Sequence, residues 1–397
     1  MGNDCCDLVH VKIPSQSFRN QTDQKENSGR RSYMRVGIIS MQRVPNYGSF
    51  LQAYGLKKLI ESLGHEVCFI DYEEGKPVVS FSKSAYLKYR ILNISGVKLI
   101  NDWFKYHVLK KHNFVYEYRM HYLRELGIGY QKNIGHVDTA VIGSDEVFNC
   151  LQSGFNVGFS PMLFGQNVPA DRVISYAASF GYTSLDGLNK YHVSGKIGEY
   201  LKTFSAISVR DENSYEIVHA LTGTDPSVNL DPVLMADFDI PEIDIPYENY
   251  VILYTYKSRA YSDKEKQMIR AFCSKNGKIL LSVGNAQDWV DVHVHASPFE
   301  LLSYIRKADF IITDTFHGSV FSIKFNKPFA TLIRDNNRQK LSDLLNRLKR
   351  SDRIINSFDE LQMMYDKQTD YTETNQVIAR EKKKTVDYLV NNLKQES

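Results

Sequence analysis

Short apolar runs alternate with helix-period segments along most of the chain. Strands are predicted in the first half at 35–40, 67–71, 139–142, 173–177 and 204–209, and in the second half at 250–254, 278–283, 310–312 and 329–333. Helical patterns lie between them, such as the one that begins after Asn46 and ends near Gly64. Alternating strands and helices are typical of parallel sheets covered by helices. We therefore predict an α/β fold with two Rossmann-like domains that face a cleft, and a closing C-terminal helix.

Polar stretches divide the chain into these parts. Residues 1–33 are polar and lack periodicity, so we expect a disordered tail outside the fold, with Met34 as an alternative start. The first domain is predicted at 34–236 and the second at 250–370, followed by a helical C-terminal segment at 371–397. Residues 237–249 between the domains are acidic and contain two prolines, as expected of a linker.

Residues 80–122 differ from the rest of the first domain. They carry eight Lys and Arg against two acidic residues, with many aromatic residues among them. We interpret about 80–125 as a helical insert on the acceptor side of the first domain. An ordinary helical layer with a solvated basic face is one interpretation. The other is a surface that meets an anionic membrane or a lipid-linked substrate.

Composition excludes several functional classes. The chain has 397 residues, a formal net charge of +3 and five cysteines without framework spacing. The charge gives no reason to expect a nucleic-acid partner, and the cysteines fit a reducing compartment. We expect no metal: His293 and His295 alternate on a strand-like segment without convincing ligand spacing. No apolar run reaches a length that could span a membrane, so we expect a cytoplasmic protein. An alternative is a cytoplasmic protein that also binds peripherally to the inner face of the membrane.

The segment 309–324 holds the strongest candidate for chemistry. Its apolar strand ends at Thr313, and a helical pattern begins just after His317 and Gly318. Ligands of open α/β sheets bind at the carboxyl ends of the strands, and helix starts there favour anions. A histidine at this place is suited to proton transfer on an anionic substrate. The alternative is a histidine that caps its helix or packs against Phe316.

Other polar residues follow predicted strands at the same edge. Arg210 is a candidate clamp for an anion, or else the partner of an acid next to it in sequence, Asp211 or Glu212. Asp145 is a candidate to orient an acceptor hydroxyl or to act as a base. The alternative is that it only caps a helix starting near Glu146. Asn46 and Gly48 either bind substrate at a helix start or only shape the turn.

Several segments together resemble one family. The chain is similar to the polysaccharide pyruvyl transferases from about residue 35 to about 335, in these segments: NYGSFLQAY (46–54), GSDEVFN (143–149), ISYAASFG (174–181), ISVRDENS (207–214), LDPVL (230–234) and ADFIITDTFHGSVFSIKFNKPF (308–329). Thr315 departs from the serine that is common in the last motif, but it keeps the hydroxyl. The order and spacing of the segments are specific for the family, though not for one substrate.

The resemblance implies a fold similar to that of GT-B glycosyltransferases. It also implies transfer of the pyruvyl group from phosphoenolpyruvate to a sugar of a surface polysaccharide or its lipid-linked precursor, as a pyruvate ketal, with release of phosphate. Phosphoenolpyruvate would be the donor substrate, and no cofactor is expected. The candidate catalytic residues are then His317 as general acid and Asp145. The candidate substrate-binding residues are Arg210, Asn46, Gly48, Thr315 and Gly318.

Two other functions remain open at this stage. A GT-B glycosyltransferase that uses a nucleotide sugar would share the fold. A non-catalytic sugar-binding homologue would keep the cleft, but the presence of both His317 and Arg210 argues against it.

Overall fold

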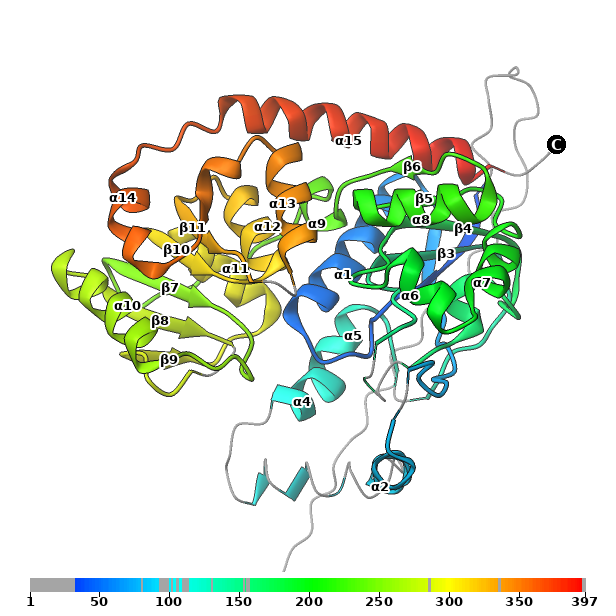
Figure 1. The fold of residues 1–397 in the computed structure, drawn as a ribbon, viewed down its shortest axis with the longest axis horizontal. Coiled ribbons are helices and arrows are strands. Elements are labelled where there is room, and N and C mark those ends of the chain that lie inside the picture. Colours follow the sequence, from blue (N-terminus) through cyan, green and yellow to red (C-terminus); the bar gives the residue numbers. More distant parts are fainter. Residues whose placement is uncertain are drawn as a thin grey trace, which may run out of the picture. The chain divides into compact units, whose positions relative to one another are not determined.

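The computed structural model describes residues 33–79, 81–92, 100, 103–104, 107–108, 114–129, 131–152, 154, 158–284, 287–334 and 337–394. Nearly all of the predicted tail, with Cys5 and Cys6, lies outside these residues. Tyr33–Ser397 forms one unit by its internal contacts, and it contains two parallel sheets (Figure 1).

The first sheet has six parallel strands in the order β2-β1-β3-β4-β5-β6. They are β1 (Arg35–Ile39), β2 (Glu66–Phe69), β3 (Val137–Asp145), β4 (Ala170–Ala178), β5 (Ser208–Val209) and β6 (Ser227–Val228). The helices of this half are α1 (Tyr47–Ser62), α2 (Lys83–Leu92), α4 (Phe114–Glu117), α5 (Leu123–Glu125), α6 (Leu185–Lys190), α7 (Ser194–Leu201), α8 (Glu212–Thr222) and α9 (Pro232–Met235). Apolar residues with little or no exposure fill the inner positions of β1, β3 and β4, as expected of a parallel sheet covered on both faces.

The second sheet also has six parallel strands, in the order β12-β11-β10-β7-β8-β9. They are β7 (Tyr250–Tyr254), β8 (Ile279–Val283), β9 (Val292–Val294), β10 (Phe310–Thr313), β11 (Phe329–Leu332) and β12 (Ile354–Ile355). Its helices are α10 (Asp263–Lys275), α11 (Pro298–Lys307), α12 (Phe316–Lys324), α13 (Arg338–Arg347) and α14 (Leu361–Asp366). The predicted α/β fold with two Rossmann-like halves is therefore confirmed, whereas the predicted domain bounds stay a prediction.

The two halves contact each other through α1 and α15 (Thr372–Asn392). The Phe50 ring of α1 packs edge-on against Phe299 of α11, and the Tyr47 hydroxyl donates to the Ala296 carbonyl at 2.7 Å. Helix α15 runs along both halves (Figure 1). Its Tyr388 hydroxyl donates to the carbonyl of Ser175 in β4, and its Glu381 pairs with an arginine of α13. The expected C-terminal helix therefore contacts both halves of the chain.

Three local expectations were wrong. Strand β3 continues through Asp145 instead of ending at residue 142, because its pairing with β4 extends to Asp145 and Ala178. The residues from Glu146 onward form turns, so Asp145 caps no helix there. Helix α12 begins at Phe316, since the Thr315 side chain caps it, and His317 therefore lies inside its first turn.

The basic insert is helical where the structure describes it, in α2, α4 and α5. Its lysines at 105, 110 and 111 lie outside the described residues. Lys324, the last residue of α12, is partly buried. Its ammonium donates to the carbonyl of Ala236 at 2.7 Å and lies 4.8 Å from the centre of the Phe238 ring, so burial lowers its pKa to about 8.

Candidate functional site

Two helix starts, one from each half, meet at the candidate site. In the first half, the Asn46 side chain caps α1 by accepting from the backbone N–H of Gly48 at 2.7 Å and of Ser49 at 3.3 Å. In the second half, the Thr315 hydroxyl caps α12 by accepting from the N–H of Gly318 at 3.0 Å. Both helices thus present the positive ends of their dipoles to the same region, which favours an anionic ligand.

Glycines allow the closest approaches at this junction. A Cβ added at Gly48 would lie 2.1 Å from Nδ1 of His317, so the imidazole lies directly against the backbone of α1. A Cβ added at Gly318 would lie 2.1 Å from the Thr313 hydroxyl oxygen. The absence of a side chain at Gly48 therefore allows His317 of the second half to contact α1 of the first half. Gly318 likewise lets the start of α12 pack against the end of β10.

His317 is buried beside a carboxylate that the sequence did not single out. Its Nε2 lies 3.6 Å from Oδ2 of Asp231, which is an ion-pair distance and too long for a hydrogen bond. Among the described residues this nitrogen has no hydrogen-bond partner. Burial opposes ionisation of Asp231, but the imidazole of His317 and the charge of Arg210 lower the pKa of this carboxyl below its ordinary value. An ionised carboxylate thus stands next to a buried ring nitrogen that has no hydrogen-bond partner among the described residues.

Arg210 is held by the same carboxylate. Its Nη1 donates to Oδ2 of Asp231 at 2.9 Å, and its Nη2 lies 4.0 Å from Oδ1 of Asp145. The guanidinium carbon lies 4.2 Å from the centre of the Phe316 ring. Contrary to the alternative considered from sequence, neither Asp211 nor Glu212 is its ion-pair partner. Asp211 instead caps α8 through Ser214.

Asp145 joins α1 to the arginine. Its Oδ2 accepts from the Ser49 hydroxyl at 2.7 Å, and its backbone adopts φ 75°, which is uncommon for a residue other than glycine. Strained backbone of this kind is concentrated at functional sites, where the surrounding structure maintains it. The carboxylate is therefore held between the start of α1 and Arg210.

The predicted site residues thus lie close together in the fold. His317 contacts Gly48 and Asp231, while Arg210 contacts Asp231 and approaches Asp145. The Asn46 and Thr315 side chains cap their helices, and the Thr315 hydroxyl also contacts that of Thr313, so the roles of these residues in binding substrate stay predictions. The residue missed from sequence is Asp231, although it lies in the LDPVL segment (230–234) of the family resemblance and precedes Pro232, a pair typical of a helix start.

Within the described ranges, no group of three or more His, Cys, Asp and Glu is arranged to hold a metal ion. His293 lies in β9 and His295 follows it, with ring centroids 4.5 Å apart. Among the helices that the structure describes, none is long and apolar enough to cross a membrane.

Comparison with known proteins identifies a family. The family model described as polysaccharide pyruvyl transferase matches residues 46–336, which is most of the chain and includes every candidate site residue. A search of curated protein sequences finds no match.

Several solved structures are distantly similar to the chain. An O-GlcNAc transferase of Thermobaculum terrenum is 11% identical, with TM-score 0.42, over 91% of this chain and 66% of that protein. A kitacinnamycin glycosyltransferase is 12% identical with TM-score 0.45, over 91% of this chain and 99% of its own. The spinosyn forosaminyltransferase is 13% identical with TM-score 0.45, over 91% and 98%. These similarities are too distant to support an inference about activity.

Proposed function

Because the chain belongs to the polysaccharide pyruvyl transferase family, we propose that it moves the pyruvyl group of phosphoenolpyruvate to a sugar and releases phosphate. The acceptor would be a sugar of a surface polysaccharide or of its lipid-linked precursor, and the product a cyclic pyruvate ketal. The observation that carries the proposal is the buried Nε2 of His317, without a hydrogen-bond partner among the described residues, next to Asp231 and Arg210.

Donor binding would rest on Arg210 and on the two helix starts. Phosphoenolpyruvate carries a carboxylate and a phosphate, and both are bound well by guanidinium and backbone N–H donors. Arg210 is pre-positioned by Asp231 and by the Phe316 ring, so little side-chain entropy is lost when it binds an anion. The starts of α1 and α12 add N–H dipoles aimed at the same region.

The reaction needs a proton at the methylene carbon of the donor. The imidazolium of His317 would deliver it, and the π electrons of the enol form the new C–H bond, leaving an oxocarbenium-like centre at C2. One sugar hydroxyl then adds to C2, a second hydroxyl displaces phosphate from C2, and the ring of the ketal closes. Of the two hydroxyl protons, one restores the imidazolium and the other leaves with phosphate. Asp145 would accept a hydroxyl proton or orient that hydroxyl.

The direct test is incubation of the purified chain with phosphoenolpyruvate and a panel of lipid-linked and soluble sugars. We expect inorganic phosphate release together with a pyruvyl mass increment on one class of acceptor. In deuterated water, deuterium should appear in the ketal methyl group. Product formation from a nucleotide sugar, with no use of phosphoenolpyruvate, would instead make the chain a glycosyltransferase.

We also propose that α2 faces the acceptor, with anionic lipid near it. Leu87 and Ile91 are 60% and 54% exposed, one helical turn apart, and Lys83 and Lys88 are exposed on the same helix. Exposed apolar side chains among lysines suit the surface of an anionic membrane. Exchange of Lys83 and Lys88 for Glu should reduce binding to phosphatidylglycerol vesicles at low salt and spare activity on a short soluble sugar. Equal losses of vesicle binding and of activity on the soluble sugar would indicate that α2 is only a structural element.

A further inference from the structure

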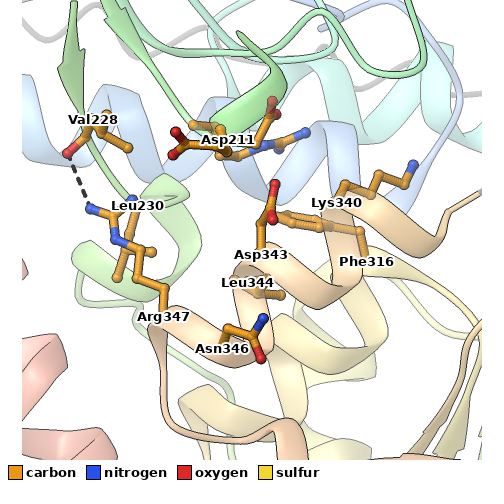
Figure 2. A pocket seen from close by; sticks show the side chains of 11 residues that line it. Asp211, Val228, Leu230, Phe316, Lys340, Asp343, Leu344, Asn346 and Arg347 are labelled. Atoms are coloured by element: carbon orange, nitrogen blue, oxygen red, sulfur yellow. Dashed lines mark hydrogen bonds between the residues drawn. The ribbon is translucent and has the colours of Figure 1, made fainter. Parts of the chain in front are cut away.

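A cavity of about 340 Å³ lies beside the proposed catalytic residues. Its walls come from both halves: from the segment after β5 and the end of β6 on one side, and from α12 and α13 on the other. Figure 2 shows that Lys340, Asp343, Leu344 and Arg347 follow one face of α13 and line the cavity together. This volume lies near the lower end of the range for small-molecule sites, which fits one sugar ring better than a long oligosaccharide.

Three residues that line the cavity each carry a buried polar atom without a hydrogen-bond partner in the described part of the chain. Oδ2 of Asp343, Nη1 of Arg347 and Nε of Arg210 are buried and make no hydrogen bond within the described part of the chain. Buried polar atoms are nearly always hydrogen-bonded, so each such atom calls for a ligand or water. The set comprises one acceptor and two donors, which matches hydroxyl groups, since a hydroxyl both donates and accepts.

Electrostatics in the cavity disfavours an anion. The three cations are already paired: Arg210 with Asp231, Lys340 with Glu146, and Arg347 with Glu381. Three carboxyl groups, those of Asp211, Glu212 and Asp343, also line it. Burial, and after it the nearby charge of Asp211, raises the pKa of Asp343. Because carboxylates balance the cations of the lining, the cavity favours a neutral ligand over a further phosphate or carboxylate.

The apolar residues of the lining also suit a sugar ring. Phe316, Leu230 and Leu344 face the cavity, and Phe316 also carries the guanidinium of Arg210 over its ring at 4.2 Å. Sugar rings combine apolar C–H faces with hydroxyls around the edge, so they bind surfaces of this mixed kind. Because Arg210 lines the cavity and also contacts Asp231 next to His317, a ligand there would lie beside the proposed donor site.

We propose that this cavity binds the uncharged sugar ring of the acceptor, with Asp343 accepting a hydrogen bond from one ring hydroxyl and Arg347 donating to another. That this sugar is the acceptor of the reaction rests on the proposed function. The preference of the cavity for a neutral sugar can be tested without turnover. Asp343 and Arg347 are then substrate-binding residues on α13, and the anionic donor lies on the His317 side of Arg210.

The test is saturation-transfer NMR on the full chain, with methyl glycosides of galactose, glucose, mannose and N-acetylglucosamine as probes. We expect at least one glycoside to bind, and Asp343→Asn to weaken it by about tenfold or more, the usual effect of unpairing a buried polar group. Asn346→Trp at the exposed rim should block the cavity without disturbing the core. Asp186→Asn, an exposed aspartate of α6 outside the cavity, is the matched control and should bind normally.

The outcomes separate this inference from the proposed function. Failure of all glycosides to bind, or equal binding by Asp343→Asn and the native chain, would overturn the inference even if phosphoenolpyruvate is turned over. Displacement of the glycoside by inorganic phosphate alone would assign the cavity to an anion and also overturn it. Glycoside binding that depends on Asp343, in a chain that does not use phosphoenolpyruvate, would support the sugar site and refute the proposed donor.

Discussion

Gly48→Ala should slow the proposed pyruvyl transfer by about 100-fold, because the added methyl group would occupy the place of the His317 ring. The new Cβ would lie 2.1 Å from Nδ1, 2.4 Å from Cγ and 2.7 Å from Cε1 of that ring. Non-bonded atoms normally stay about 3.5 Å apart, so the imidazole or the start of α1 must move by more than about 1 Å. A displacement of about 1 Å at a reacting group costs about 10² in rate.

The assay is kcat from inorganic phosphate release, together with thermal unfolding. Overpacking of this kind destabilises a protein by about 1–3 kcal/mol, so the variant should melt at a lower temperature but stay folded. Gly195→Ala is the matched control, because Gly195 also lies in the first turn of a helix, α7, and nothing lies within 4 Å of a Cβ there. It should keep its kcat and be stabilised by up to about 1 kcal/mol, since alanine favours helices over glycine.

The position of the ring can be followed independently of activity. The imidazole proton signals of His317, assigned with a His317→Gln variant, should shift in Gly48→Ala and stay unchanged in Gly195→Ala. A folded Gly48→Ala chain with native imidazole signals and native kcat would refute the contact between α1 and His317. A lowered kcat with native signals would refute displacement of the ring as the cause.

Three other predictions follow from the same cluster. Arg210→Ala should weaken phosphoenolpyruvate binding by about 2–4 kcal/mol in calorimetry, the range for removing one partner of a buried charge pair; unaltered affinity in a folded variant would refute the clamp. His317→Gln should lower kcat by about 10²–10⁴ and change donor affinity much less; a near-native kcat would return the histidine to a packing role. Burial opposes ionisation of Glu146, but Lys340 at 2.8 Å lowers its pKa to about 2, below the ordinary 4.5. The ion pair therefore stabilises the fold above about pH 4.5, and this stability is lost as the pH falls toward 2. Urea unfolding should show native chain and Glu146→Gln differing at pH 7 and converging at the acid end, whereas a constant difference would contradict the pairing.

Local sequence signals predicted the helix starts well, because caps depend on residues that are close in sequence. The sequence pattern of a capping box, Ser followed three residues later by Glu, occurs at Ser262 and again at Ser297, and the structure has a capping box at both. Asn46 likewise caps its helix, as the turn interpretation expected. A side chain that hydrogen-bonds the N–H groups of the next turn leaves the same pattern in any fold, so sequence alone identifies it.

The pairing of Arg210 could not be predicted, because it depends on strand order. Strand β5 lies next to β6, and Val209 pairs with Val228. This register brings Arg210, which follows β5, next to the segment that follows β6. That segment begins at Asn229 and carries Asp231 two residues later. Sequence proximity suggested Asp211 or Glu212 instead. The contacts of α13 with the first half, such as that of Lys340 with Glu146, were hidden for the same reason.

The charge balance of the cluster limits how the donor can be recognised. Asp231 and Asp145 stand against one guanidinium and one imidazole, so the cluster is close to neutral when His317 is protonated and carries net negative charge when it is not. Recognition of the proposed donor would therefore rest on Arg210 and the protonated histidine together with the N–H groups at the starts of α1 and α12, and not on an excess of cations in this cluster. Binding of a polyanionic donor would then favour the imidazolium, which is the form that the first chemical step consumes. Under this scheme the group that completes the anion site is also the acid.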